Sequence, residues 1–387
     1  MNRNNVKKLN KRSNHVLIRN DTRFKNIHER LVKLNILNGL PAFITKKYTS
    51  EEYFNVFEQA SLYNVSIKQM CIIGREHGKR WPSPEQVMKC CRKNTSAQMT
   101  NFINFALLQQ FNAIPKPLRQ QLKKSGIIFI DFHQDPYYGN KENPDVKRSK
   151  TKKSTTHFYE YLTASAYCPK GRVTIAIIHR NPDEGIFDPV KCILEFIERV
   201  LSPKIMVFDG EFSTVAILSL LNHKKIKFLA RKSRTGRIKT HIASHYSMPD
   251  WKSFRKWHPI QLKSWRSHIK TVYVDVCPQD VKGEIKTLIK SQGWVITPQY
   301  ADKLYAKRFN IESGYRDKHK FQIFTCTKIL STRLVFILLA TLLWNCWQIF
   351  LMWVKNLKSY SKFLPRTFAI RLSATWTIHT LRTSINS

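Results

Sequence analysis

Hydrophobic and polar positions follow a helical period from Ser50 to about Lys124. Apolar residues recur at helical spacing from Ser50 onward, where Ser50 can cap a helix whose first turn holds Glu51 and Glu52. A second run with the same spacing extends over Ser96–Phe111. The pattern predicts a small module of helices over residues 48–124.

The period changes at Gly126 to short apolar runs of strand length. The first run, Ile127–Asp131, predicts a buried strand that ends in an acid. Strands are also expected at Phe158–Tyr167, Val173–His179, Lys204–Asp209 and Ile226–Ala230, and helices at Asp188–Val200 and Phe212–Asn222. Hairpin-like strands followed by this alternation predict an α/β fold with a mixed sheet flanked by helices.

The alternation stops over residues 231–298, which are rich in Lys, Arg, Trp and Ser. Strand-like pieces at Thr271–Val276 and Trp294–Thr297 indicate a β-containing insertion. Helical spacing returns at Tyr300–Lys320, and a second, apolar helix is expected at residues 334–354. The α/β core is therefore predicted to come from two parts of the chain.

The apolar run Leu334–Val354 is long enough to cross a bilayer. It contains Thr341, Asn345 and Gln348, and nothing else in the sequence resembles a membrane span. The central helix of a soluble protein is apolar all round for the same reason that a membrane helix is. We interpret the run as a buried core helix and expect no membrane among the partners.

These patterns divide the chain into six segments. They are a basic N-terminal arm (1–47), a helical region (48–124), the first part of the α/β core (125–230), an insertion subdomain (231–298), the second part of the core (299–354) and a basic C-terminal tail (355–387). Within the core, the basic stretch at residues 147–153 is expected to be an exposed loop that can contact phosphate.

The charge balance indicates a polyanionic partner. The 387 residues include 66 Lys and Arg against 26 Asp and Glu, which gives a net charge of +40, far more than solubility requires. Because the positive charge is spread along the whole chain, nucleic acid fits better than an anionic membrane, and small-molecule metabolism is disfavoured. The helical region 48–124 is then either a DNA-end-binding domain, which the charge favours, or a solvated helical cap.

Cysteine and glycine patterns argue against several other classes of protein. The eight cysteines form no CxxC pair and no zinc-binding spacing, and no signal peptide precedes them. They are expected to be reduced, mostly buried thiols of a cytoplasmic protein. Neither GxxxxGK[ST] nor GxGxxG occurs, which disfavours an ATP-driven motor.

Acids are scarce in this chain, so their placement is informative. Asp131 and Asp209 each close an apolar strand, and ligands of open α/β sheets bind beyond the carboxyl ends of the strands. Each is alternatively a turn or helix-cap residue, since Asp favours both. His133, two residues beyond Asp131, is either a further metal-binding residue or a packing residue. Asp135 precedes a proline, which is a turn signal.

A third acid, Glu312, lies on the predicted helix at 300–320. At about 100° per residue, Tyr305, Arg308 and Glu312 share one narrow face of that helix. His319 extends the same stripe. These residue types make a poor core face, so the stripe is either functional or a solvated face with an ordinary i, i+4 Arg–Glu pair.

One family of enzymes combines these features. With its spacing Tyr305-x2-Arg308-x3-Glu312, its strand-end aspartates in IFID and VFDG and its long apolar helix, the chain resembles the insertion-sequence DDE transposases of the Tyr-Arg-Glu-Lys signature group. The resemblance covers about residues 125–354. It implies an RNase H-like core interrupted by a β-rich insertion, with the two aspartates and Glu312 as the catalytic, metal-binding triad.

The resemblance implies metal-dependent chemistry on DNA. Two Mg²⁺ (or Mn²⁺) ions held by Asp131, Asp209 and Glu312 would activate water for the first nick and the freed 3′-OH for later steps. The expected function is a DDE transposase that binds transposon ends and catalyses strand cleavage and strand transfer, by cut-and-paste through a hairpin intermediate. The expected partners are double-stranded inverted-repeat ends and target DNA, on which the protein assembles as a homodimer. The expected location is the cytoplasm of a prokaryote, in association with the nucleoid.

The same resemblance assigns DNA contacts. Tyr305 and Arg308 are expected to bind phosphate near the metals. The family's final Lys would fall at His319, so Arg316 and His319 are expected to take its place, with Lys320 in support.

Several alternatives stay open on the sequence. The chain is alternatively an RNase H-like nuclease without strand transfer, or a non-catalytic DNA-binding derivative of a transposase. Trp294 in the insertion is either a stacking partner for a flipped base or a packing residue.

Overall fold

The computed structural model describes residue 45 and residues 47–232, 238–240, 256–264, 271–281, 284–353, 365–370 and 372–373. Outside this description lie the side chains of residues 279–281, 284–286 and 309–313 and almost all of the predicted arm (1–47) and tail (355–387). The chain divides into two compact units, which are Met1–Arg119 with Arg316–Ser387, and Gln120–Tyr315.

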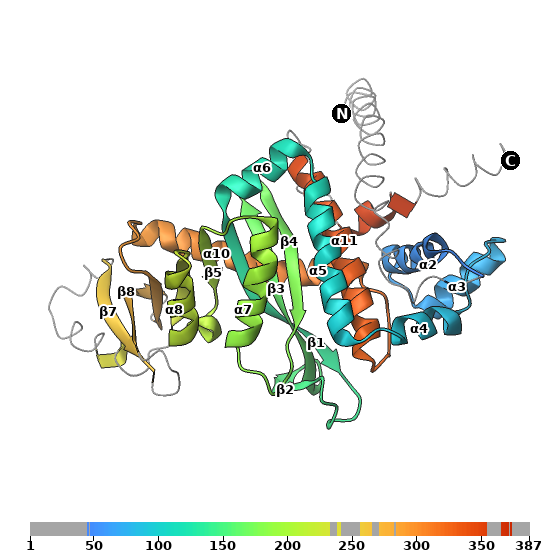
Figure 1. Cartoon of the computed structure of the whole chain (residues 1–387), viewed down its shortest axis with the longest axis horizontal. Coiled ribbons are helices and arrows are strands. Elements are labelled where there is room, and N and C mark those ends of the chain that lie inside the picture. The colour runs from blue at the N-terminus through green and yellow to red at the C-terminus, as the bar shows by residue number, and fades with distance from the viewer. Residues whose placement is uncertain are drawn as a thin grey trace, which may run out of the picture. The chain divides into compact units, whose positions relative to one another are not determined.

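The described part of the first unit is helical (Figure 1). Its elements are α2 (Ser50–Tyr63), α3 (Ile67–Glu76), α4 (Pro84–Arg92), α5 (Ser96–Ala113), η5 (His319–Phe321) and α11 (Leu330–Trp353). The Thr49 hydroxyl accepts from the Glu52 amide, and the Glu52 carboxylate accepts from the Thr49 amide. Thr49, not the predicted Ser50, caps α2, because this paired cap needs Glu or Gln three residues further on, and Ser50 has Tyr53 at that position.

Helix α11 is buried along nearly its whole length, where it contacts α2, α4, α5 and η5. Among the described residues it is the one helix long and apolar enough to cross a membrane, and 89% of its most apolar window is buried. Gln110 of α5 donates to the Leu342 carbonyl (2.9 Å) and accepts from Asn345 Nδ2 (2.7 Å). These contacts agree with the prediction of a buried core helix.

The predicted second part of the core (299–354) is divided between the units. Most of α10 (Pro298–Lys318) belongs to the second unit, whereas α11 belongs to the first. A helix that is apolar on all sides can bury the apolar faces of several helices at once. The N-terminal helices and α11 therefore form one unit, although they are far apart in the sequence.

The second unit is built on a sheet that has nine strands among the described residues, and the sheet is mixed, as the sequence predicts. Its strands are β1 (Ile127–Tyr137), β2 (Lys147–Lys152), β3 (Thr155–Cys168), β4 (Gly171–His179), β5 (Ile205–Phe208), β6 (Lys227–Lys232), β7 (His258–Lys263), β8 (Thr271–Val281) and β9 (Glu284–Ser291). The order is β2-β3-β1-β5-β6-β9-β8-β7, with β4 also paired to β3. The pairs β1–β5 and β5–β6 are parallel and the others antiparallel.

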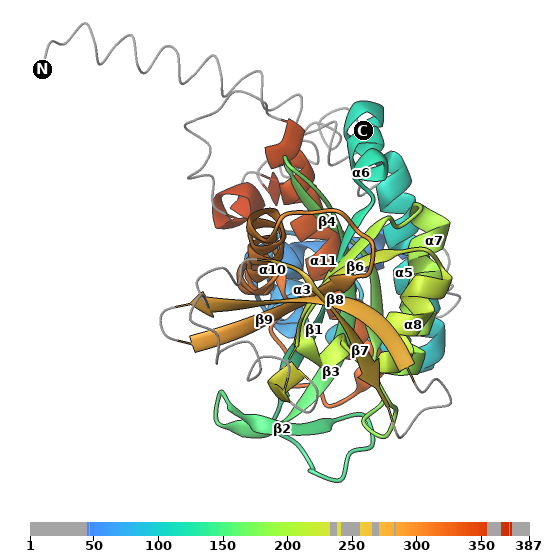
Figure 2. The same ribbon diagram turned by 90° about the vertical axis from the view of Figure 1, so that its left-hand side faces the viewer.

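Helices cover both faces of this sheet. Figure 2 shows α7 (Phe187–Val200) and α8 (Val215–His223) on one side of the strands and α10 on the other. The α10 side holds a core of strand residues packed against helix residues, which are Phe129, Val207, Leu229, Leu288, Ala301, Leu304 and Tyr305, together with Trp294. This core seats α10 against β1, β5, β6 and β9. The helix α6 (Lys116–Ser125) leads into β1.

Several strand boundaries differ from the predicted ones. β1 runs past Asp131 to Tyr137, so Asp131 lies inside a strand and Asp135 is not in a turn. Antiparallel pairing with β3 over the whole length of β1 extends it. Pro136 is tolerated because, in the described structure, β5 pairs with β1 only up to Phe129, so the far end of β1 has a free edge.

The predicted loop at 147–153 is also mostly strand, as β2. The strand-like piece at Trp294–Thr297 forms no strand. Since β9 pairs with β6, the strands of the predicted insertion continue the same sheet.

Candidate active site

Two aspartates reach the same level on neighbouring parallel strands. Phe129 of β1 pairs with Val207 of β5, and extending this register by two residues brings Asp131 level with Asp209, which follows the last residue of β5. Side chains two residues apart point to the same face of a sheet. Because Phe129 and Val207 pack against α10, both carboxylates face that helix.

The Arg308 guanidinium of α10 lies between these carboxylates. Its Nη1 donates to Asp131 Oδ2 at 3.0 Å, and its Nη2 lies 3.8 Å from Asp209 Oδ2. The Arg308 side chain is 4% exposed, against 13% for Asp131 and 49% for Asp209. Burial disfavours the charged guanidinium, but the nearby Asp131, Tyr305 and Asp209 outweigh it and raise the pKa of Arg308. Both carboxylates thus face the same point, which the Arg308 guanidinium occupies in this structure.

Tyr305 joins the same helix to Asp209. Its ring is fully buried in the core on the α10 side, and its hydroxyl donates to Asp209 Oδ1 at 3.2 Å. The same oxygen accepts from the Gly210 amide at 2.7 Å. Burial raises the pKa of Tyr305, so its hydroxyl remains a protonated donor at ordinary pH.

A second tyrosine of α10 supports β1. The Tyr315 hydroxyl shares a hydrogen bond with Thr163 Oγ1 (2.7 Å), and Thr163 donates to the Asp131 carbonyl (3.2 Å). The His133 and Tyr315 ring centroids lie 4.5 Å apart, which agrees with the packing interpretation of His133. Tyr315 was not among the residues predicted from the sequence, although it follows Arg308 by seven residues, or about two helical turns.

The residues present fit a divalent metal ion. Glu312 follows Arg308 by four residues, about one turn of α10, and its side chain lies outside the description. Among the described side chains, no group of three His, Cys, Asp or Glu is arranged to hold a metal. Asp131 and Asp209 nevertheless offer the carboxylate oxygens that Mg²⁺ and Mn²⁺ prefer, and they converge on one point.

The residues predicted to replace the family's Lys do not belong to the same unit as the two aspartates. Arg316, His319 and Lys320 belong to the first unit, whereas the aspartates belong to the second. α10 ends at Lys318, and His319 begins a 3₁₀ turn in which its ring bonds the Gln322 side chain. The stripe calculated for an α-helix therefore ends before His319, because a 3₁₀ turn rotates more per residue.

Three other predicted DNA contacts have buried side chains. Trp294 is 6% exposed and packs in the core, as the packing alternative requires. The Tyr305 hydroxyl is bound to Asp209, and Arg308 holds both aspartates. The physical reason is that two adjacent carboxylates attract the nearest donor and the nearest cation. In this structure, therefore, none of the three presents a free face to a DNA backbone.

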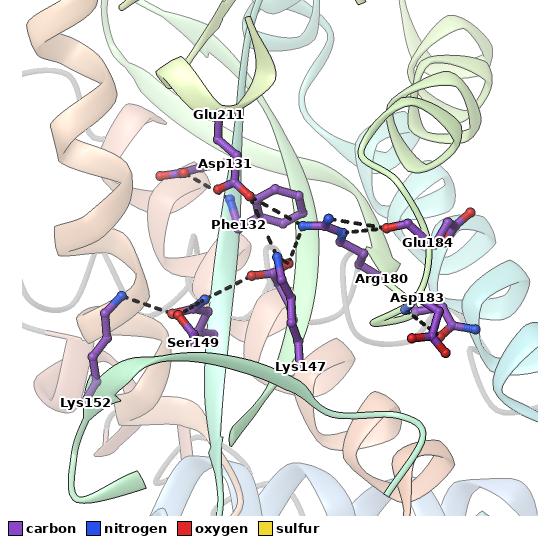
Figure 3. Close-up of polar contacts among 12 residues, drawn as sticks. Asp131, Phe132, Lys147, Ser149, Lys152, Arg180, Asp183, Glu184 and Glu211 are labelled. Atoms are coloured by element: carbon purple, nitrogen blue, oxygen red, sulfur yellow. Dashed lines mark hydrogen bonds and ion pairs between the residues drawn. The ribbon is translucent and has the colours of Figure 1, made fainter. Parts of the chain in front are cut away.

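A polar network joins β2 and β3 to the segment that follows β5, and no sequence pattern predicted it (Figure 3). Glu160 of β3 is 2% exposed and binds Arg180 Nη1 at 2.8 Å and Lys147 Nζ at 3.1 Å. Both cations also approach Glu211 Oε1, at 3.5 and 3.8 Å. Since Glu211 follows Asp209 by two residues, the network joins β2 and β3 to the loop that holds Asp209.

The fold of this chain is similar to that of a transposase of known structure. The piggyBac transposase, in a cryo-EM structure of its synaptic complex with hairpin DNA, matches with a TM-score of 0.56. The chain has a transposase-like fold. The match covers 94% of this chain and 81% of the other, at 11% sequence identity. No protein-family model and no curated protein matches the sequence.

Proposed function

We propose that this protein is a DDE transposase with an RNase H-like core, in which Asp131, Asp209 and Glu312 hold the metal ions. The observation that supports this most strongly is the position of Asp131 in β1 and of Asp209 directly after the neighbouring parallel strand β5, with Arg308 forming an ion pair with each. The strand order β4-β3-β1-β5-β6, with an antiparallel meander before the parallel pairs, and the transposase-like fold support it too.

In this proposal Asp131, Asp209 and Glu312 would hold two Mg²⁺ or Mn²⁺ ions, which when bound would supply the positive charge that activates the attacking oxygen and stabilises the leaving 3′ oxygen of the DNA. The protein's own residues supply placement and charge. Asp131 is fixed by the sheet and Asp209 by the Gly210 amide and the Tyr305 hydroxyl, so their oxygens are oriented before DNA arrives. Arg308 neutralises the pair until the metal does, and its planar fork suits a DNA phosphate equally well.

The charge of the chain supports DNA as the substrate. A net charge of +40 suits a backbone of phosphates. The matched piggyBac structure is a synaptic complex with hairpin DNA. We propose that this chain likewise binds transposon ends and target DNA as a homodimer, with end binding by the helical first unit, and that it cuts and pastes through a hairpin intermediate. We further assign it to the Tyr-Arg-Glu-Lys group of insertion-sequence transposases, with magnesium as the metal and a prokaryotic cytoplasm as its location.

Conservative variants of the three acids test this function. Asp131→Asn, Asp209→Asn and Glu312→Gln should each abolish Mg²⁺-dependent cleavage of a duplex made from the inverted repeats beside the gene. DNA affinity should stay within about twofold, because each change removes a metal ligand and no phosphate contact. Glu195→Gln, at an exposed acid of α7, is the matched control and should cleave normally.

The products separate the alternatives. Cleavage followed by joining to target DNA supports a transposase, whereas cleavage without joining supports a nuclease. Full cleavage by any one of the three acid variants would overturn the site assignment.

A further inference from the structure

A basic hairpin lies at one edge of the sheet, formed by β2 and the start of β3. Figures 1 and 2 both show β2 at the lower end of β1 and β3. β2 has the sequence KRSKTK, and Lys153 follows it in the turn. Arg148, Lys150 and Lys153 are exposed, and none of them forms an ion pair with a residue that the structure describes. These three cations are therefore available to a partner in solution.

The remaining cations of the hairpin are bound inward. Lys147 binds Glu160 (3.1 Å), and Lys152 donates to Gln134 Oε1 (3.0 Å). Gln134 in turn donates to Glu160 Oε1 (3.0 Å) and to Ser149 (3.4 Å), so the network fixes both ends of β2 to β1 and β3 (Figure 3). The exposed cations thus stand on a rigid ribbon, which limits the entropy lost when they bind a partner.

The turn of the hairpin has an unusual backbone. Lys153 and Ser154 have φ values of 48° and 60°, in the left-handed region where Asn and Gly are the usual residues of two-residue hairpin turns. The hydroxyl of Tyr138, itself 66% exposed, donates to the Lys153 carbonyl at 2.8 Å and fixes this turn. Strained positions of this kind cluster at functional sites. A lysine is thus held at the tip of the ribbon despite an unfavourable conformation.

The ribbon also has a defined relation to the aspartates. Arg148 pairs with His157 and His157 with Tyr137, so Arg148 lies on the face of the sheet that bears Asp131. Tyr137 is six residues beyond Asp131 along β1. At about 3.3 Å per residue this is about 20 Å, the length of about six base pairs of duplex DNA.

We propose that the β2–β3 hairpin is a phosphate-binding ribbon for duplex DNA. Arg148, Lys150 and Lys153 contact the DNA backbone. Their contacts lie about six base pairs from the phosphodiester bond that is cleaved at Asp131 and Asp209. The Glu160 network holds the ribbon in register with the Asp209 loop through Glu211. The proposal rests on the proposed function, since it names a surface by which that site receives its substrate.

Salt-dependent binding tests the ribbon in the full-length protein. Affinity for a labelled random-sequence DNA duplex is measured over a range of salt concentrations for the wild type and for the triple variant Arg148→Ala, Lys150→Ala, Lys153→Ala. Each phosphate contact contributes about 0.9 to the slope of log K against log salt, so the variant should lose up to about 2.7 units of slope and at least about tenfold in affinity.

The control removes the same charge elsewhere in the second unit. Lys123, Lys124 and Lys170 are exposed near the opposite end of β1 and β3, and replacing all three by Ala should change affinity by less than about twofold. A charge-preserving variant, Arg148→Lys with Lys150→Arg and Lys153→Arg, should bind like the wild type, which separates lost charge from lost folding.

The outcomes distinguish the two proposals. Wild-type binding with a steep slope, together with equal losses in the hairpin and control variants, overturns the ribbon and leaves the proposed function standing. A wild type without salt-dependent DNA binding overturns both. Selective loss in the Ala variant of the hairpin, with retention in the charge-preserving variant, establishes the ribbon.

Discussion

At the scale of single residues, three charges decide the state of the site. Asp131 and Asp209 repel each other, and in the structure Arg308 removes that repulsion by contacting both. Neither the short chain segments around these residues nor their spacing reveals this contact, because Arg308 and Asp131 are 177 positions apart. The sequence does single out the two aspartates, since each directly follows an apolar run of the kind that forms a buried strand.

Removal of Arg308 should therefore destabilise the protein and increase its response to metal. Arg308→Gln leaves two carboxylates, one of them largely buried, without a counter-charge, which should lower the free energy of unfolding by about 3 kcal/mol. Adding Mn²⁺ should restore more stability to this variant than to the wild type, because the metal no longer competes with the guanidinium. Thermal unfolding with and without Mn²⁺ measures both effects.

Arg316→Gln is the matched control, at an exposed arginine two turns further along α10. It should change neither stability nor the response to Mn²⁺. Equal behaviour of the Arg308 and Arg316 variants would contradict the role assigned to Arg308.

At the scale of elements, local pattern predicts which segments are strands better than where they end. The run Ile127–Asp131 has the composition of a strand, but its extension to Tyr137 depends on pairing with β3. The basic stretch 147–153 has no apolar pattern, and it forms β2 because Lys147 and Lys152 are bound by polar partners from β1 and β3. Tertiary pairing therefore decides what local propensity leaves open.

The turn between β2 and β3 should become more stable when its two residues are replaced by ones that favour positive φ. Lys153→Asn with Ser154→Gly places the residues that φ values of 48° and 60° favour, and should raise the free energy of unfolding by about 1 kcal/mol. The same variant should bind duplex DNA more weakly, because it removes one exposed cation. Urea unfolding and salt-dependent DNA binding measure the two effects. A loss of stability would show that the turn geometry is wrong.

At the scale of the whole molecule, the sequence reveals the kind of fold but not how the chain is divided. The mixed sheet and its helices follow from the order of strand and helix patterns. The assignment of α11 to the first unit does not, since an apolar helix has no feature that names its partners. The net charge of +40 likewise indicates a polyanion without showing where it binds.

Anomalous diffraction from crystals grown with Mn²⁺ and a transposon-end duplex would show whether Asp131 and Asp209 hold the metal, as the proposed function requires. The expected result is Mn²⁺ peaks bonded to Asp131 and Asp209, with Glu312 completing the site and Arg308 released from both aspartates. Crystals that contain the DNA but still show Arg308 between the two aspartates, with no manganese on either carboxylate, would contradict it.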